Sequence, residues 1–173
     1  KEMKADQAYA GIFEGQFEFI AETFIPGIEL SAELIVERGN TKVCVFHEKV
    51  EVENSGQTML ENSCVSPPIG ISASEMDEGR QYLEQCVQAL GLETGCFHLE
   101  VKYDRGSGLW DLIEANPRVG GALIKESTEI VTGGRCLLSD WIKTLLNQPV
   151  ESFNRKPKWG TFFRIYFGEQ GRT

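Results

Sequence analysis

The chain has 173 residues, of which 41% are hydrophobic and 25% are charged, and its formal net charge is −9. This composition is typical of one soluble globular domain with a substantial core. The negative charge argues against sequence-independent nucleic-acid binding, which needs a basic face, and no apolar run approaches the roughly 20 residues of a membrane span.

The cysteines and histidines bear on compartment and metal chemistry. There are five cysteines, at irregular spacing and without a CxxC pair, which favours reduced thiols over a disulfide framework. Two histidines are too few for most structural zinc sites. With no signal-peptide pattern, we expect a cytoplasmic protein that binds neither membranes nor nucleic acids. Because the sequence opens at Lys1 without a clear first element, we also expect it to be a piece of a longer chain.

The first third of the sequence predicts strands. Residues 17–25 are rich in β-forming residues and end at Pro26-Gly27. From Glu29 onward apolar residues (Leu30, Ala32, Leu34 and Val36) alternate with polar residues (Glu29, Ser31 and Glu33), which predicts a half-buried strand. The turn "RGNT" follows, and residues 42–52 predict the second strand of a hairpin.

The middle and the end of the sequence predict helices around a second hairpin. Residues 53–71 are predicted to be rich in loops, and Ser72 to Glu75 form a capping-box pattern that opens a helix reaching about Leu90. Residues 121–134 and 136–148 predict two further helices separated by glycines, and the tail from Lys158 predicts the beginning of a strand. Strands joined mostly as hairpins, together with these helices, favour an α+β fold with an antiparallel sheet. The apolar stripe of the first helix is expected to comprise Met76, Leu83, Val87 and Leu90.

The second hairpin, Cys96 to Gly121, carries paired carboxylates. Folding it about the turn at Ser107 places Glu100 opposite Glu114, with His98 opposite Asn116. Like charges facing each other destabilise a sheet unless a cation lies between them. Two carboxylates and an amide oxygen on one face are ligands that Mg²⁺ prefers. The alternative is that both glutamates are solvated and that Lys102 neutralises them.

The residues around this pair add to the predicted site. Arg118 offers a planar donor fork for a phosphate or carboxylate, and Gly120-Gly121 allow a close backbone approach. We expect His98 to bond Asn116 or a backbone carbonyl rather than a metal, because Mg²⁺ prefers oxygen ligands.

At these residues the sequence resembles the ATP-grasp superfamily. "IEANPRVGG" is similar to its metal-binding signature, "FHLEVK" to the strand before it, and "AETFIPGIELSAELIV" to the segment that joins the two ATP-clamping lobes. The resemblance covers roughly residues 17–148. It implies the C-terminal lobe of an ATP-grasp fold, an antiparallel sheet flanked by helices. Residues 1–28 would end the preceding lobe and form the interlobe segment, 29–148 would form the C-terminal lobe, and 149–173 would be a linker and the start of a C-terminal extension.

The resemblance also implies ligands for individual residues. The backbone at Glu22 to Ile25 would hold the adenine edge of ATP, and Glu29 would bind the ribose hydroxyls. The metal ligands implied are Glu100, Glu114 and Asn116, which would bridge Mg²⁺, or Mn²⁺ in its place, to the phosphates. Arg118 would act in catalysis by stabilising the acyl phosphate.

A further stretch, "FHEKVEVENSGQTMLENSCVSPP", resembles the amino-acid ligase branch of the superfamily. By this resemblance Glu61 would meet a substrate ammonium, and Lys49 a phosphate or carboxylate. Cys64 stands where relatives often carry a histidine, which is a departure from the pattern of the branch. The alternative is that Glu61 is an ordinary loop glutamate.

The resemblance implies an ATP-dependent ligase that activates a small carboxylate as an acyl phosphate and joins it to an amine, as amino-acid or dipeptide ligases do. Biotin-carboxylase-like, carbamoyl-phosphate-synthase-like and purine-biosynthetic enzymes share the signature and are alternatives. A non-catalytic nucleotide-binding module or dimer interface is another. The partners implied are ATP, the two substrates, the N-terminal lobe of the same protein and, in a homodimer, a second copy. Without that lobe, we expect this chain alone not to turn over substrate.

Overall fold

A computed structural model describes residues 21–54, 59–153 and 156–166. For residues 51–54 and 59–61 it describes the backbone only. It contains six strands and three helices in these ranges: β1 (Ile28–Glu37), β2 (Asn40–Asn54), β3 (Met59–Ser66), α1 (Ala73–Ala89), β4 (Gly95–Asp104), β5 (Leu109–Asn116), α2 (Ile124–Val131), α3 (Leu137–Leu145) and β6 (Thr161–Arg164). Within the described residues, no helix has the length and apolar character needed to cross a bilayer.

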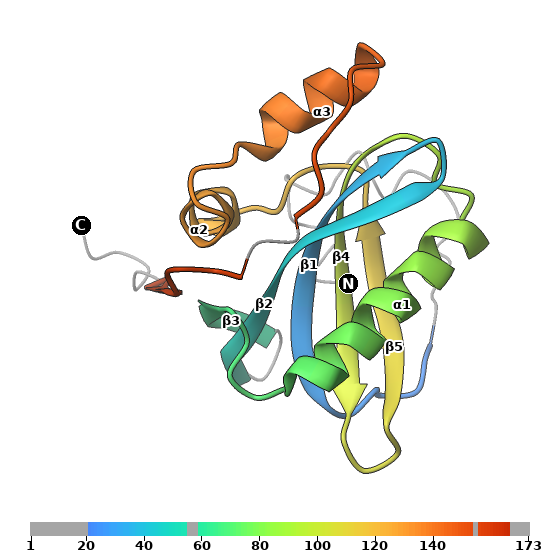
Figure 1. Ribbon diagram of the computed structural model, residues 1–173. Helices are drawn as coiled ribbons and strands as arrows, with labels where there is room; N and C mark the ends of the chain where they lie inside the picture. The colour runs from blue at the N-terminus through green and yellow to red at the C-terminus, as the bar shows by residue number, and fades with distance from the viewer. Residues whose placement is uncertain (1–20, 55–58, 154–155, 167–173) are drawn as a thin grey trace, which may run out of the picture.

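The strands form one antiparallel sheet in the order β5-β4-β1-β2-β3-β6. The predicted α+β class is therefore confirmed. Figure 1 shows α1 lying across one face of the sheet, with α2 and α3 grouped on the side away from it. β1 pairs with β4 on one side and β2 on the other, so the strand predicted from Glu29 to Glu37 lies inside the sheet.

The face under α1 holds the main hydrophobic core. Alternate residues of β1 and β4 point into it, because side chains of a strand alternate between its two faces. The predicted capping box of α1 is present: the Ser72 hydroxyl accepts from the Glu75 amide, and the Glu75 carboxylate accepts from the Ser72 amide. Leu83 and Val87 are buried as predicted, but Leu90 is 49% exposed because it is the C-cap and lies beyond the packed turns.

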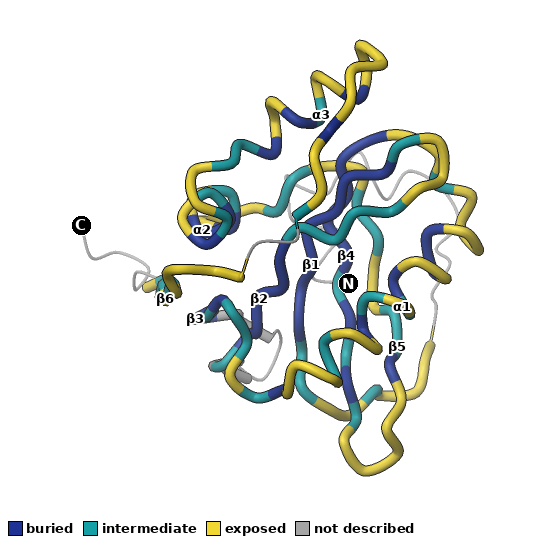
Figure 2. The backbone as a smooth tube through the Cα atoms, in the orientation of Figure 1, coloured by how far each residue is buried: buried dark blue, intermediate teal, exposed yellow. Residues whose placement is uncertain are grey.

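The prediction that β1 is half-buried is wrong. Its other face carries Ser31 and Glu33, which are 1% and 0% exposed. A smaller core beneath α3, containing Ile35 and Leu137, packs on this side. Figure 2 shows the resulting burial along β1 and its neighbour β4. Ser31 and Glu33 are therefore buried on this face rather than solvated.

The predicted loop-rich stretch, residues 53–71, is also partly wrong, because it contains β3. Its mixed polarity hides a strand that is paired on both sides, with β2 and with β6. The predicted strand at the end of the sequence is β6, and it lies in the same sheet. The β-rich prediction for residues 17–25 falls partly outside the described residues, and residues 21–26 have no regular secondary structure. The division at residues 28 and 148 stays a prediction.

His47 on β2 connects the sheet to α2. Its side chain is fully buried, and its Nε2 lies 2.8 Å from the hydroxyl of Ser127. Burial, and then the charge of His98, lower the pKa of His47 to about 4. The folded state therefore keeps His47 neutral at a pH where the unfolded chain binds a proton, so stability falls as the pH drops below about 6.5.

We expect His47→Gln to remove this pH dependence. Between pH 7 and pH 5 the native chain should lose about 2 kcal/mol more unfolding free energy than the variant, because only the native chain has this buried imidazole to keep neutral. Urea unfolding at both pH values measures the difference. Equal losses in the two proteins would show that His47 does not contribute to acid sensitivity.

Candidate active site

The hairpin of β4 and β5 has the predicted pairing at the carboxylates. Glu100 lies opposite Glu114 and His98 opposite Asn116. Nearer the turn the register shifts by one, so that Val101 pairs with Leu112. This β-bulge separates the pairing at the site from the pairing at the turn. The two glutamates therefore face each other, as the sequence predicts.

Glu100 belongs to a chain of ion pairs across three strands. The Lys49 ammonium lies 2.6 Å from Glu100 Oε2 and 2.9 Å from Glu29 Oε1, and its side chain is only 2% exposed. Lys102 Nζ lies 3.3 Å from Glu29 Oε2. The network balances carboxylates against basic groups, and its members are Glu29, Glu33, Glu100, Lys49, His98 and Lys102.

His98 contacts two carboxylates, which corrects the predicted bond to Asn116 or a backbone carbonyl. Its Nδ1 bonds the Glu33 carboxylate and its Nε2 lies 3.2 Å from Glu100 Oε1. Burial lowers the pKa of His98, but hydrogen bonds and charges of Glu100 and Glu33 outweigh it and raise the pKa to about 9. Burial likewise raises the pKa of Glu100, but His98 and Lys49 bring it down to about 2. Both groups are therefore charged near neutral pH.

Gly120 holds the loop after β5 against this network. Its amide donates to Glu33 Oε2 over 3.1 Å. A Cβ at this position would lie 2.6 Å from Glu33 Oε1, 2.7 Å from His98 Nδ1 and 2.5 Å from the Ile124 side chain. The close backbone approach predicted for Gly120-Gly121 is therefore present at Gly120. It buries the Glu33 carboxylate beneath the start of α2.

The proposed metal ligands lie along the outer end of the same face. Glu114 is exposed and accepts a hydrogen bond from Asn116 Nδ2 over 2.6 Å. In the described part of the chain, no group of three or more histidine, cysteine, aspartate or glutamate side chains is arranged to hold a metal ion. Two carboxylates and an amide oxygen nevertheless fit Mg²⁺, which usually takes one or two protein carboxylates and completes its shell with substrate phosphates and water.

The three residues predicted to contact ATP lie on or beside β1. Glu29 accepts a hydrogen bond from Lys49 and forms an ion pair with Lys102, whereas Glu22 is exposed. Lys102 also donates to the carbonyl of Ile25 over 3.1 Å and lies 4.7 Å from the centre of the exposed Phe24 ring. These contacts hold Phe24 and Ile25 against Lys102, near the end of β4 and beside the charged network.

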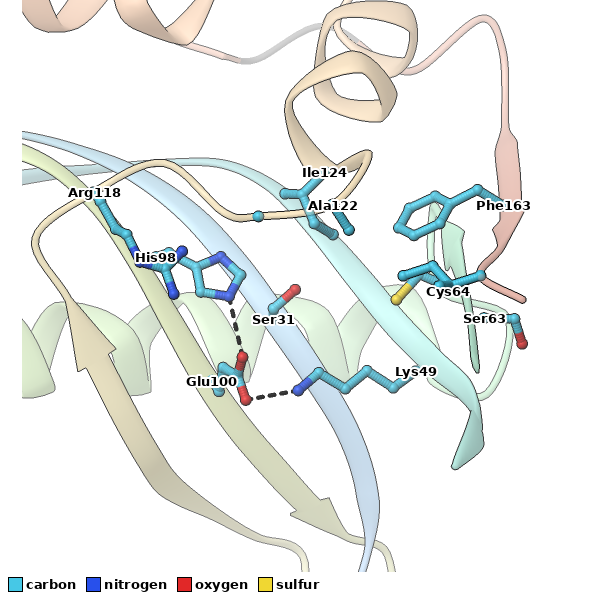
Figure 3. A pocket seen from close by; sticks show the side chains of 12 residues that line it. Ser31, Lys49, Ser63, Cys64, His98, Glu100, Arg118, Ala122, Ile124 and Phe163 are labelled. Carbon is cyan, nitrogen blue, oxygen red and sulfur yellow. Dashed lines mark hydrogen bonds and ion pairs between the residues drawn. The ribbon is translucent and has the colours of Figure 1, made fainter. Parts of the chain in front are cut away.

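An open pocket of about 240 Å³ lies over this network. Figure 3 shows Arg118 and His98 at one end, Lys49 and Glu100 below, and Phe163 with Ile124 at the other end. Arg118 is exposed, and its Nη1 donates to the Val119 carbonyl over 3.1 Å. The pocket brings together three of the predicted site residues, Lys49, Glu100 and Arg118.

The structure adds residues that the sequence interpretation left out. Ser31 and Phe163 line the pocket, and Glu33 orients His98. For Ser31 and Glu33, the available sequence signal was their position with Glu29 on one face of a predicted strand. Cys64 lines the pocket as well, and it forms no disulfide with another described cysteine. The predicted ammonium contact of Glu61 falls on a side chain outside the described residues.

Comparisons with known proteins show which family model and which solved structures this chain is similar to. A family model described as an ATP-grasp domain matches residues 1–126. Among solved structures, an L-amino acid ligase from Bacillus licheniformis shares 23% identity over 80% of this chain and 35% of its own, with a TM-score of 0.67. Biotin carboxylase from Campylobacter jejuni shares 17% identity over 82% of this chain and 30% of its own, with a TM-score of 0.66.

A third similar structure is phosphoribosylglycinamide synthetase from Anaerococcus prevotii, with 22% identity over 64% of this chain and 27% of its own, and a TM-score of 0.55. At these identities the likeness shows the fold alone. The chain spans about a third of the length of these proteins. None of the curated protein sequences matches it.

Proposed function

The chain belongs to the ATP-grasp domain family, and from this membership we propose that it is the metal-binding lobe of a carboxylate–amine ligase. The reaction would use ATP to activate a small carboxylate as an acyl phosphate, which an amine then attacks. The observation that carries the proposal is the pairing of Glu100 with Glu114 beside Asn116, above a pocket lined by cationic side chains.

Glu100, Glu114 and Asn116 would hold Mg²⁺ against the nucleotide phosphates. Bound Mg²⁺ would neutralise phosphate charge during phosphoryl transfer, a reaction that depends mainly on positioning and electrostatics. Glu100 is ready for this role over a wide pH range, because its low pKa keeps it ionised. Both of its oxygens have cationic partners, His98 and Lys49, so a metal ion must share the carboxylate with them.

The remaining residues would bind and orient the reactants. Glu29 would accept from the ribose hydroxyls, and the exposed Glu22 and half-buried Ile25 would border the adenine. Arg118 and Lys49 supply positive charge at the pocket, where an acyl phosphate or a carboxylate would carry negative charge. Lys49 would be held in place by Glu29 and Glu100 and would point its ammonium at the reacting groups.

The proposal is tested by titrating Mn²⁺ into the chain, with and without ADP, and following water proton relaxation. We expect weak Mn²⁺ binding that ADP tightens, because the phosphates complete a shell for which the protein supplies few ligands. Glu114→Gln should weaken Mn²⁺ binding at least tenfold in the presence of ADP, because it removes one of two carboxylates.

Glu84→Gln is the matched control, since Glu84 is an exposed glutamate on α1, across the sheet from the site. It should bind Mn²⁺ as the native chain does. Mn²⁺ binding that is equal in all three proteins, or that ADP leaves unchanged, would contradict the assignment of Glu114 as a metal ligand.

A further inference from the structure

The pocket over the network has two chemically different ends. At one end Arg118 supplies positive charge beside the ion pair of His98 with Glu100; at the other, the lining is apolar and includes Ile124, Phe163 and Ile165. In Figure 3 the Phe163 ring points toward Ala122 and Ile124, at the end of the pocket far from Arg118. A ligand that fills the pocket would therefore present an acidic group at one end and an apolar group at the other.

The floor between these ends has a hydroxyl group suited to a polar ligand atom. Ser31 is 1% exposed, and its Oγ makes no hydrogen bond to any described residue. Figure 3 shows Ser31 between His98 and Lys49, at the base of the pocket. A buried hydroxyl without a partner costs free energy that a ligand's hydrogen bond would recover.

The apolar end is built by β6, which lies outside the residues matched by the family model. β6 pairs with β3 so that Phe163 lies opposite Cys64. Because side chains alternate along a strand, Phe163 faces the pocket whereas its neighbour Phe162 is 62% exposed. Phe163 therefore closes the apolar end from a strand that the shared family region does not supply.

The size of the pocket limits its occupant. Its volume of about 240 Å³ equals that of about eight water molecules in the liquid. A small acid with a short apolar group fits within this space.

We propose that this pocket binds the carboxylate substrate as a small acid with a short apolar side chain, its acid group toward Arg118, and that Phe163 limits the length of that side chain. This inference rests on the proposed ligase function, because it names the substrate class of the same site. Ser31 would bond a polar atom near the middle of the ligand, and Ile124 and Ile165 would pack against its side chain.

The test measures the binding of four acids to the isotope-labelled chain by amide NMR titration: acetate, succinate, 3-methylbutanoate and phenylacetate. We expect 3-methylbutanoate to bind at least tenfold more tightly than acetate or succinate, because each buried methylene contributes about 0.8 kcal/mol. Phe163→Ala should raise the affinity for phenylacetate, relative to that for 3-methylbutanoate, at least tenfold. Phe162→Ala, on the same strand, should leave the order of the four affinities unchanged. Arg118→Gln should weaken the binding of all four acids.

Mg²⁺–ADP binding, followed in the same samples, separates this inference from the proposed function. The inference would be overturned if the acids bound without selectivity, or if Phe163→Ala left their selectivity unchanged. Mg²⁺–ADP binding in the same samples would then still support the ligase assignment. Selective acid binding without any Mg²⁺–ADP binding would support the pocket and contradict the assignment. If none of the acids bound, the inference would be wrong.

Discussion

Glu33→Ala is expected to lower the free energy of unfolding by about 3–5 kcal/mol, the usual cost of removing one partner from a buried ion pair. Glu33 is fully buried, and its carboxylate accepts hydrogen bonds from His98 Nδ1 and from the Gly120 amide. Its loss would leave a buried imidazolium with one carboxylate in place of two. Urea unfolding at pH 7 measures the change.

The matched control is Glu37→Ala, in the same strand. Glu37 pairs with Lys42, and both side chains are about a fifth exposed, so the expected cost is no more than about 1 kcal/mol. A second readout is the pH dependence. Because the pKa of His98 is raised to about 9, its contribution to stability is fully present below about pH 6.5 and is lost as the pH rises through 9. That alkaline loss should shrink in Glu33→Ala. Equal costs for the two variants would rule out a special role for Glu33.

The paired carboxylates could be predicted from sequence because their partners are close along the chain. A hairpin fixes its own register through a local turn and a period of two, so Glu100 and Glu114 could be placed opposite each other. The bulge before Val101 did not disturb this, because the shift falls between the turn and the site. Local patterns likewise identified the capping box of α1, whose partners are three residues apart.

The far side of β1 could not be predicted, because its environment comes from distant segments. Ser31 and Glu33 follow the alternation of a solvated strand face, yet α2 and α3 cover that face. The partner of His98 shows the same limitation: Asn116 is opposite it on β5, whereas Glu33 is opposite it on β1, 65 residues away. The sequence alone does not distinguish these two neighbours. In the structure, His98 bonds the buried carboxylate of Glu33.

The pocket depends on pairings that are still less local. The sequence did not predict β3, because it lies in a stretch of mixed polarity that contains "SPP", and it acquires its role only by pairing with β2 and β6. Phe163 reaches the pocket because β6 returns to pair with β3, about 100 residues later in the sequence. A strand signal at the end of a chain indicates that such a strand exists, but not which edge of the sheet it joins.

Lys49→Met is expected to have the second large effect, with a loss of about 3 kcal/mol of unfolding free energy. The Lys49 ammonium is buried and makes charge-assisted hydrogen bonds to Glu29 and Glu100, each of the kind that contributes about 1.5–3 kcal/mol. Part of the loss comes from leaving Glu100 without this partner. Lys49→Met with Glu100→Gln should therefore recover about half of it, and a double-mutant cycle by urea unfolding measures the coupling.

The same variant separates a metal site from a purely structural ion pair. Lys49 and a divalent cation would compete for the Glu100 carboxylate, so Lys49→Met should bind Mn²⁺ alone several-fold more tightly than the native chain. ADP should then tighten Mn²⁺ binding less than it does in the native chain, because the variant has lost a cation that would contact phosphate. If Lys49→Met left Mn²⁺ affinity unchanged while the stability loss was observed, Glu100 would be a structural partner of Lys49, and its assignment as a metal ligand would be wrong.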